Sequence, residues 1–397
     1  MKKRILALLL LLALTTALLP GCRKKVTTGE IGVEHDTEFG GTYIGLTIDQ
    51  FNKLGFAFGD SVDIAFRGGK TLEDVPYYSG YYVPVGSLLL CGYPGYPHPV
   101  IARNFGNSSW EEFGMTEDSK VTVTLREKGK YLSSQEFYSL KYSDERKDFD
   151  SDVIFANFRE LRGGNLRAGA VYRSASPIDN QHKRASYANA LAEKYGIAFA
   201  LNLSDTQEKY QKHVAGEDFS SQYYDGLYKD GKVMILEERV AVSELLSAVR
   251  DDLYETGKAS ILGMTANYRS TAFARTLAEG LAGMSENEGP CLIHCVEGKD
   301  RTGFVCALLL ALADASPQEI LDEYMITFDN YYKITKETKP EQYAAVEDNA
   351  KDFFYCMCDV ESGTPLDQMD VKKGAEDYLR RGGLTDEEIA KIEAWLR

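Results

Sequence analysis

A short polar loop between an apolar strand and an apolar helix is the feature that most constrains this chain. The run Cys291–His294 is apolar and has the length of a buried strand, and Phe304–Ala313 is an apolar stretch long enough for about three helical turns. Between them lies Cys-Val-Glu-Gly-Lys-Asp-Arg-Thr-Gly. N–H groups in such a loop and in the first helical turn lack acceptors within the helix, and the helix dipole is positive there. The pattern therefore predicts an anion site that fits a phosphate group.

A nucleotide-binding loop is the first alternative for this segment. Gly298 and Lys299 could be its last glycine and its lysine. However, Ile293 stands where the first glycine of that motif is required, and Asp300 follows the lysine where Ser or Thr would bind magnesium. The motif therefore fails at two positions. What remains is a cysteine, five intervening residues and Arg301.

The pair Cys295 and Arg301 predicts nucleophilic chemistry on phosphorus. Only the thiolate attacks, and nearby N–H groups, a helix N-terminus and a cation all favour it. A guanidinium can bind two phosphate oxygens at once and stabilise the transferred phosphoryl group. We expect no metal and no cofactor to be needed. The other loop residues predicted to bind substrate are Val296, Glu297, Gly298, Lys299, Thr302 and Gly303.

Several side chains of the segment carry separate expectations. His294 is expected to orient the loop, and Thr302 either to cap the helix or to hydrogen-bond the sulfur. The Glu297 side chain is expected to face solvent. Lys299 is either a surface lysine or a second loop cation that admits substrates with extra phosphates, such as inositol phosphates.

The string from His294 to Gly303 resembles the signature of the cysteine-dependent protein tyrosine phosphatases. It is most similar to the bacterial secreted branch, whose loop carries Lys-Asp before the Arg. Residues 157–161 with 171–174 resemble the opening strand of that family, and residues 378–385 resemble its closing helix. The resemblance implies an α/β domain whose central sheet is flanked by helices. It also implies substrates among phosphotyrosine, phosphoserine, phosphothreonine and phosphoinositides.

The general acid has two candidates. The family usually has Asp-Leu-Arg at the end of one strand, whereas this chain has Asn202, Leu203 and Ser204 there. Asp205, directly after this strand, is similar to one acid position of the family. Asp300 lies inside the loop, and the resemblance to the Lys-Asp branch implies the acid role for it. Asp300 is the first choice, and a leaving group needs one such acid within hydrogen-bond reach.

The pattern of residues 152–397 supports the α/β assignment, because short apolar runs alternate with longer amphipathic ones. Strands are predicted over 170–172, 197–203, 233–236 and 291–294, and helices over 181–194, 243–255 and 266–281. Capping boxes predict further helices that start at Ser316 and Thr385. Residues 142–151 are polar and charged and are predicted to be a linker.

Residues 23–141 form a separate, β-rich region of unassigned role. Alternating runs such as Ser61–Phe66 and Lys120–Leu125 predict strands, and Gly- and Pro-rich turns separate them. The many tyrosines there either fill a β core or form a surface that binds carbohydrate or protein by stacking.

The first 22 residues predict a lipoprotein signal peptide. Lys2, Lys3 and Arg4 precede the apolar run Ile5–Leu19, which is followed by Pro-Gly-Cys22. This ending resembles a bacterial lipobox, which implies lipidation of Cys22 and an extracytoplasmic protein held at the cell membrane by its N-terminal lipid anchor. A plain secretory signal and an uncleaved anchor are the alternatives.

Charge and cysteine content argue against three further classes. A formal net charge of −15 argues against nucleic acid as a partner, because that affinity comes from clustered Lys and Arg. Seven cysteines without a CxxC pair do not indicate a disulfide scaffold or a structural zinc site.

Three functions follow in order of preference. The first is a phosphatase acting on phosphotyrosine and other phosphoprotein residues through a phosphocysteine intermediate. The second is a phosphoinositide or inositol phosphate phosphatase. The third is a surface binding lipoprotein whose phosphatase domain is vestigial, which the complete set of Cys295, Asp300 and Arg301 argues against.

Overall fold

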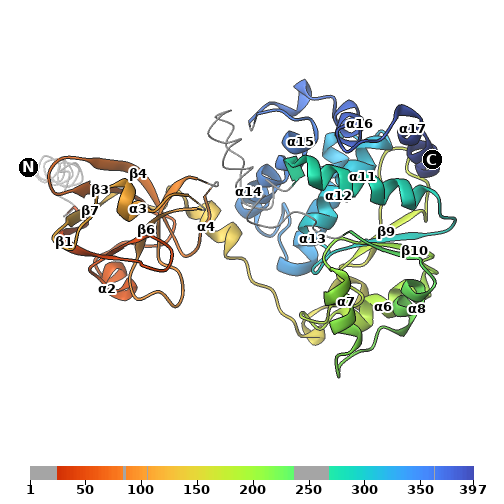
Figure 1. Cartoon of the computed structure of the whole chain (residues 1–397), viewed down its shortest axis with the longest axis horizontal. Helices are drawn as coiled ribbons and strands as arrows, with labels where there is room; N and C mark the ends of the chain where they lie inside the picture. Colours follow the sequence, from red (N-terminus) through yellow and green to blue (C-terminus); the bar gives the residue numbers. More distant parts are fainter. Residues whose placement is uncertain (1–24, 84–85, 105, 237–267, 362) are drawn as a thin grey trace, which may run out of the picture. The chain divides into compact units, whose positions relative to one another are not determined.

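The computed structural model describes residues 25–83, 86–104, 106–236, 268–361 and 363–397. The predicted signal peptide with Cys22 and the predicted helix over 243–255 lie outside these residues. The chain divides into two compact units (Figure 1). The first extends to Gly80 and includes Leu90–Ile101 and Ser109–Tyr131, and the second comprises Tyr81–Leu89, Ala102–Ser108 and Leu132–Arg397.

The first unit contains a closed β-barrel, so the predicted β-rich region is present. Its strand order is β1-β2-β6-β5-β4-β3-β7. In β7, Val121 and Val123 are buried and alternate with more exposed threonines, as expected for a strand with one face on a core. Tyr77 and Tyr78 are also buried, so these tyrosines fill the core. The elements are β1 (Thr27–His35), β2 (Thr42–Ile44), α2 (Ile48–Lys53), β3 (Ser61–Phe66), β4 (Thr71–Tyr78), β5 (Leu88–Cys91), β6 (Val100–Arg103), α3 (Ser109–Glu112) and β7 (Lys120–Glu127).

The second unit is built on a five-stranded sheet of order β11-β10-β12-β9-β8. The strands are β8 (Arg159–Glu160), β9 (Val171–Ser174), β10 (Phe199–Asn202), β11 (Val233–Ile235) and β12 (Cys291–His294). All neighbouring pairs are parallel except β8 with β9. In the register, His294 is the partner of both Asn202 and Ser174. The segments that follow β9, β10 and β12 therefore start side by side at one edge of the sheet.

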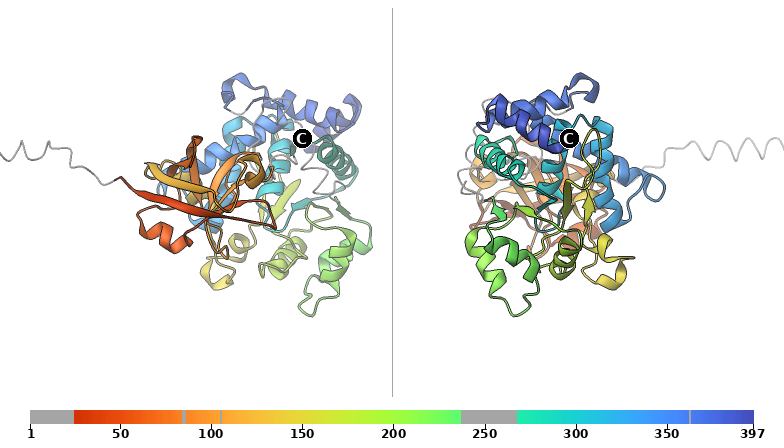
Figure 2. Two further views of the ribbon diagram at one scale, coloured as in Figure 1. Left: turned by 60° about the vertical axis from the view of Figure 1, so that its left-hand side comes forward. Right: turned by 90° about the vertical axis from the view of Figure 1, so that its right-hand side faces the viewer.

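Helices cover both faces of this sheet (Figures 1 and 2). Leu292 packs in the core with α6 and the aromatic residues of α7 and α8, whereas Cys291 and Ile293 face the larger core of α11–α17. The helical elements of the unit are α4 (Leu132–Tyr138), η1 (Arg146–Asp148), α5 (Asp152–Phe155), α6 (Ala185–Lys194), α7 (Gln207–Val214), α8 (Gln222–Lys229), α11 (Thr271–Ser285), α12 (Asp300–Leu312), α13 (Pro317–Tyr332), α14 (Pro340–Ala350), α15 (Asp352–Met357), η2 (Leu366–Gln368), α16 (Val371–Arg381) and α17 (Asp386–Leu396). The predicted mixed α/β architecture is confirmed.

The predicted helix starts agree with the structure where capping residues define them. Ser316 and Thr385 each cap a helix with a complete capping box, α13 and α17 respectively. The helix after the loop, α12, starts at Asp300, four residues earlier than its apolar run. It is buried on all sides from Thr302 to Leu312, which explains its lack of a polar face.

Three segments differ from their predictions. The helix predicted over 266–281 corresponds to α11, which is capped by Ser270 and spans Thr271–Ser285. Helix α6 starts at Ala185 and not at residue 181, because Lys183 has a φ of 56°, which no right-handed helix accommodates. Residues 142–151, predicted to be a linker, contain η1 and belong to the second unit. The buried Arg184 binds this segment by donating to the Ser143 carbonyl and the Asp144 carboxylate.

In the described part of the chain, no helix combines the length and apolar character needed to span a bilayer.

Candidate active site

The loop that follows the central strand β12 brings the predicted site residues together. Cys295 is its first residue and is 4% exposed. The loop is anchored to its neighbours at both sides, because Leu203 N–H donates to the His294 carbonyl at 2.9 Å and Ser176 N–H donates to the Val296 carbonyl at 3.0 Å. The anchors come from the segments after β10 and β9. The sheet register thus positions the start of the loop.

The next carbonyls of the loop also point outward to donors of the scaffold. The Tyr331 hydroxyl donates to the Glu297 carbonyl at 2.6 Å. The Gly298 carbonyl accepts from Arg173 at 2.7 Å and from Asn157 at 3.0 Å. Arg173 also lies 3.3 Å from the Lys299 carbonyl.

This pattern determines where the loop N–H groups point. In a trans peptide the carbonyl of one residue and the N–H of the next are directed oppositely, and the described residues contain no cis peptide bond. The N–H groups of residues 297–300 therefore face away from the scaffold donors. Within the described ranges, no acceptor is bound to these four groups. With the N-terminus of α12 beside them, they form the concave donor set that binds a tetrahedral anion.

Arg173 is the main support of this shape. It is completely buried and donates to Glu323 of α13 at 2.6 Å. Glu323 also accepts from Arg159 at 2.7 Å. Burial would raise the pKa of the Glu323 carboxyl, but the two arginines outweigh burial and lower it. One buried carboxylate thus pairs with two guanidinium groups, one of which binds the loop. The sequence analysis missed this pairing, although a charged residue inside a four-residue buried strand was its signal.

Gly298 is required by the shape of the loop. Its φ is 65°, and a Cβ at this position would lie 2.2 Å from the Ser174 carbonyl oxygen. Backbone contacts of this kind cannot be relieved by rotating a side chain. Gly303, in the first turn of α12, is packed against the Tyr324 ring, which a Cβ would approach to 2.7 Å.

His294 is buried in the wall behind the loop. Its Nε2 lies 2.5 Å from the Tyr224 hydroxyl. Burial lowers the pKa of His294 to about 4 and raises the pKa of Tyr224 well above its ordinary value. Both groups are therefore neutral at pH 7 and share one hydrogen bond. This is a supporting contact, which agrees with an orienting role.

Arg301 and Thr302 occupy the first turn of α12. Arg301 donates to the Leu203 carbonyl at 2.9 Å, so its guanidinium lies at the edge of the sheet beside the loop. Thr302 is completely buried and is not the N-cap, which is Lys299. Its hydroxyl has no hydrogen-bond partner among the described residues. The predicted capping bond is therefore wrong, because Thr302 lies three residues inside the helix boundary.

The two candidate acids differ in environment. Asp300 accepts from the Tyr324 hydroxyl at 3.2 Å, and its side chain is 33% exposed. Asp205 is 1% exposed at its side chain and bonds Asn202 at 2.8 Å and His213 at 3.2 Å. Burial raises the pKa of Asp205, but these hydrogen bonds outweigh it and lower the pKa.

Asn202, where the family usually has Asp, has a local task. Its side-chain oxygen accepts from the N–H groups of Ser204 and Asp205, both at 3.1 Å, and its amide donates to the Asp205 carboxylate. The departure from the usual pattern thus builds the turn after β10.

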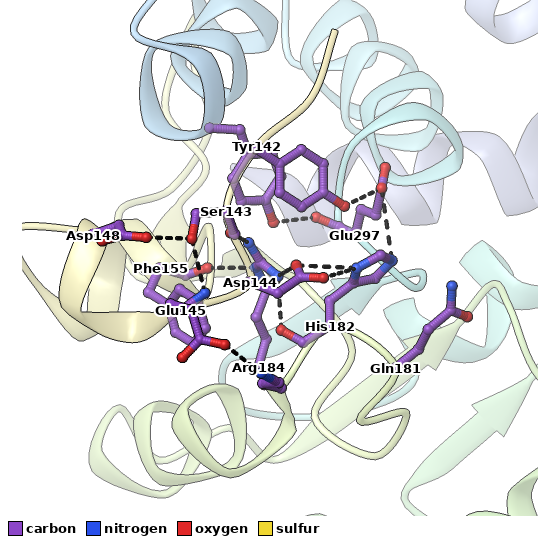
Figure 3. Close-up of polar contacts among 12 residues, drawn as sticks. Tyr142, Ser143, Asp144, Glu145, Asp148, Phe155, Gln181, His182, Arg184 and Glu297 are labelled. Carbon is purple, nitrogen blue, oxygen red and sulfur yellow. Dashed lines mark hydrogen bonds and ion pairs between the residues drawn. The ribbon is translucent and has the colours of Figure 1, made fainter. Parts of the chain in front are cut away.

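Glu297 and Lys299 form an ion pair on the loop. The Glu297 carboxylate accepts from Lys299 at 3.0 Å. It also accepts from the Tyr142 hydroxyl (Figure 3). The expectation that Glu297 faces solvent is wrong, because its side chain is only 25% exposed and doubly bound. Lys299 is 18% exposed and also lies 3.7 Å from Asp300 and 3.2 Å from the Tyr332 hydroxyl. It is not a free surface lysine.

One group of metal-ligating side chains lies nearby in the described part of the chain. Ligand atoms of Asp179, Asp205 and His213 are within 4.8 Å of one another. Asp205 and His213 already form an ion pair, so the group is stable without a cation.

Gly298→Ala tests whether loop shape governs anion binding. The clash with Ser174 should displace the loop and raise the Kd for tungstate by at least about tenfold, which is about 1.4 kcal/mol. Isothermal titration calorimetry measures this change. Gly196→Ala is the matched control, because Gly196 has a φ of 64° with open space around its Cβ position. Equal weakening in both variants would mean that the Ser174 contact is not responsible.

Comparison with known proteins agrees with this geometry. The sequence model of the tyrosine phosphatase family matches residues 155–397. A tyrosine-protein phosphatase of Nostoc commune is 28% identical over 121 residues, which is 26% of this chain and 40% of the relative. The matched part thus spans well under half of that relative. Because the family model covers more than half of this chain, the chain belongs to the tyrosine phosphatase family.

Proposed function

We propose that this protein is a cysteine-dependent phosphatase that hydrolyses phosphomonoesters through a phosphocysteine intermediate. Family membership indicates phosphatase activity. The observation that carries the mechanism is the outward binding of the loop carbonyls, which aims the N–H groups of residues 297–300 at one place beside Cys295. A phosphoryl group fits this donor set.

In the first step, the Cys295 thiolate attacks phosphorus. A new S–P bond forms, the bond from phosphorus to the ester oxygen breaks, and that oxygen takes a proton from the general acid. The loop N–H groups, the dipole of α12 and the Arg301 guanidinium favour the thiolate and stabilise the charge on the phosphoryl oxygens. For this, Arg301 would turn from the Leu203 carbonyl or share its remaining N–H groups.

In the second step, water attacks phosphorus and the S–P bond breaks. The carboxylate left by the first step accepts the proton of the water, so the acid is regenerated. The products are inorganic phosphate and the thiolate. The chain's own residues supply every group that this sequence of steps needs.

We assign the acid role to Asp300 in preference to Asp205. Asp300 lies in the loop, is one-third exposed and is held by the Tyr324 hydroxyl. Asp205 is almost fully buried, and its bonds to Asn202 and His213 stabilise the ionised form, which is the wrong form for a proton donor.

The preferred substrates are phosphoprotein residues, first phosphotyrosine and then phosphoserine and phosphothreonine. The relative in Nostoc commune carries the name tyrosine-protein phosphatase. One argument for phosphoinositides or inositol phosphates, beside export from the cell, was Lys299 as an additional free cation. The pairing of Lys299 with Glu297 at 3.0 Å removes that argument.

Cys295→Ser should lower kcat/KM for a phosphotyrosine peptide by at least about a thousandfold, because loss of a nucleophile removes the covalent step. Phosphate release measures the rate, and tungstate affinity shows that the site is still folded. Cys358→Ser is the control, because Cys358 is a partly exposed cysteine at the C-terminal end of α15. This variant should retain the activity of the parent. Residual hydrolysis above one-tenth of the parent rate in Cys295→Ser would refute the mechanism.

Asp300→Asn and Asp205→Asn separate the two acids. Loss of the true acid slows hydrolysis strongly when the leaving group is poor and only slightly when it is good. Asp300→Asn should therefore slow the hydrolysis of a phosphotyrosine peptide by about a hundredfold or more. Its effect on an activated aryl phosphate should be several times smaller. Steady-state kinetics on both substrates measures this difference. If Asp205→Asn shows the leaving-group dependence instead, the assignment of Asp300 is wrong.

We also propose that Cys22 is lipidated and anchors an extracytoplasmic enzyme to the cell membrane. The lipobox-like ending after the apolar run supports this proposal. Expressed in a bacterial host, the parent chain should enter the detergent phase in a phase-separation assay and incorporate labelled fatty acid. Cys22→Ala should do neither. Equal labelling of both chains would exclude Cys22 as the attachment site.

A further inference from the structure

The carboxylate of Glu297 connects the phosphate loop to a segment that precedes the family match. One oxygen accepts from the Tyr142 hydroxyl (Figure 3). The other oxygen lies 3.0 Å from the Lys299 ammonium. His182 Nε2 lies 3.8 Å from the first oxygen. Burial would raise the pKa of Glu297, but Lys299, Tyr142 and His182 outweigh burial and lower it. Glu297 is therefore an anion at neutral pH.

Tyr142 is held firmly in this position. Its ring stacks on Tyr331 with centroids 4.8 Å apart, and the Arg184 guanidinium lies 4.9 Å from its centroid. The following Asp144 bonds Arg184 at 2.7 Å and His182 at 3.2 Å. Figure 3 shows these side chains gathered around His182 and Arg184. The Tyr142 hydroxyl that binds Glu297 is thus held in place by the stacking on Tyr331, by the Arg184 guanidinium and by the bonds of the neighbouring Asp144.

Two nearby carboxylates, those of Glu297 and Asp300, balance the positive charge of Lys299. Burial would lower the pKa of Lys299, but Asp300, Tyr332 and Glu297 outweigh burial and raise it, so the ammonium keeps its charge within the pair. From residue 295 to residue 303, two acidic side chains, Glu297 and Asp300, balance two basic ones, Lys299 and Arg301.

We propose that Glu297 is a specificity-determining residue that restricts the site to phosphomonoesters without a second phosphate close to the reacting one. Its charge occupies Lys299, the cation that would otherwise bind an additional phosphate. Tyr142 is the positioning residue that directs the Glu297 carboxylate toward Lys299. This inference rests on the proposed phosphatase activity and names the substrate class of the same site.

The physical reason is the charge that a second phosphate meets. A phosphate monoester carries between one and two negative charges at pH 7. A second one near the loop meets the Glu297 carboxylate beside a lysine that is already paired. Removing the carboxylate charge leaves Lys299 available. It changes the summed charge of the Asp, Glu, Lys and Arg side chains of the loop, which excludes the Cys295 thiolate, from zero to +1.

The test compares two peptides that differ by one phosphate. One carries a single phosphotyrosine, and the other carries a second phosphotyrosine beside it. The measured quantity is the ratio of kcat/KM for the doubly phosphorylated peptide to that for the singly phosphorylated peptide. Glu297→Gln should raise this ratio about fivefold at low salt, which is the order expected for one partly screened charge. The gain should appear in KM and decline at high ionic strength, because it comes from binding.

A charge cycle separates this proposal from a structural effect of the substitution. Lys299→Gln should lower the ratio, and the double variant Glu297→Gln/Lys299→Gln should return it to within about twofold of the parent, since the net charge is again zero. Tyr142→Phe keeps the ring contacts and removes only the hydroxyl, so it should raise the ratio by less than Glu297→Gln. An unchanged ratio in Tyr142→Phe would overturn the positioning role.

Glu286→Gln is the matched control. Glu286 pairs with Lys391 at 3.3 Å on the exposed surface, and it precedes β12 at the sheet edge opposite to the loop. The same change of charge there should leave the ratio unaltered. A parent enzyme that hydrolyses neither peptide would refute the proposed function. A parent that hydrolyses the single phosphotyrosine, with no change of ratio in Glu297→Gln, would refute only this inference.

Discussion

The buried guanidinium of Arg173 is the interaction on which the site depends. It lies on β9, binds the Gly298 and Lys299 carbonyls, and is neutralised by Glu323 of α13. A buried ion pair adds little net stability, but removal of one partner leaves an uncompensated charge and costs about 3–5 kcal/mol. The role of this ion pair is therefore to fix the conformation of the loop. It holds two peptide groups with their oxygens outward, so the adjacent N–H groups form the anion site.

Other scaffold donors bind the remaining loop carbonyls in the same way. Tyr331 holds the Glu297 carbonyl, and Asn157 adds a second bond to the Gly298 carbonyl. The N–H groups of Leu203 and Ser176 hold the carbonyls at the start of the loop. The donors come from three strand ends and one helix. The fold thus acts on substrate indirectly, through the orientation of the backbone. A phosphate-binding loop without these contacts would be free to turn its carbonyls inward, where they would repel an anion.

The sequence was sufficient to predict the loop and the elements on either side of it. Local patterns carry that information: Cys291–His294 is a strand with the predicted bounds, and capping boxes mark the starts of α13 and α17. The supporting contacts could not be predicted, because they join residues far apart in the chain. Arg173 and Glu323 are 150 positions apart, and no local pattern records their pairing.

The side-chain environments of Glu297 and Asp205 illustrate the same limit. A glutamate in a polar loop is usually solvated, yet Tyr142 covers Glu297 from 155 positions away. An aspartate after a strand in this family suggests an acid, yet Asn202 and His213 bind Asp205 and stabilise its charge. Both outcomes depend on which neighbour is present in space, which only the folded chain reveals.

The position of Tyr142 has a practical consequence for anyone who isolates the enzyme in pieces. The family match begins at residue 155, whereas the compact unit that holds the loop begins its continuous part at Leu132. A fragment cut at the boundary suggested by homology would retain Cys295 and Arg301 but would lose the hydroxyl beside Glu297. It would also lose Ser143 and Asp144, which bind the buried Arg184, so boundaries for recombinant work belong upstream of α4.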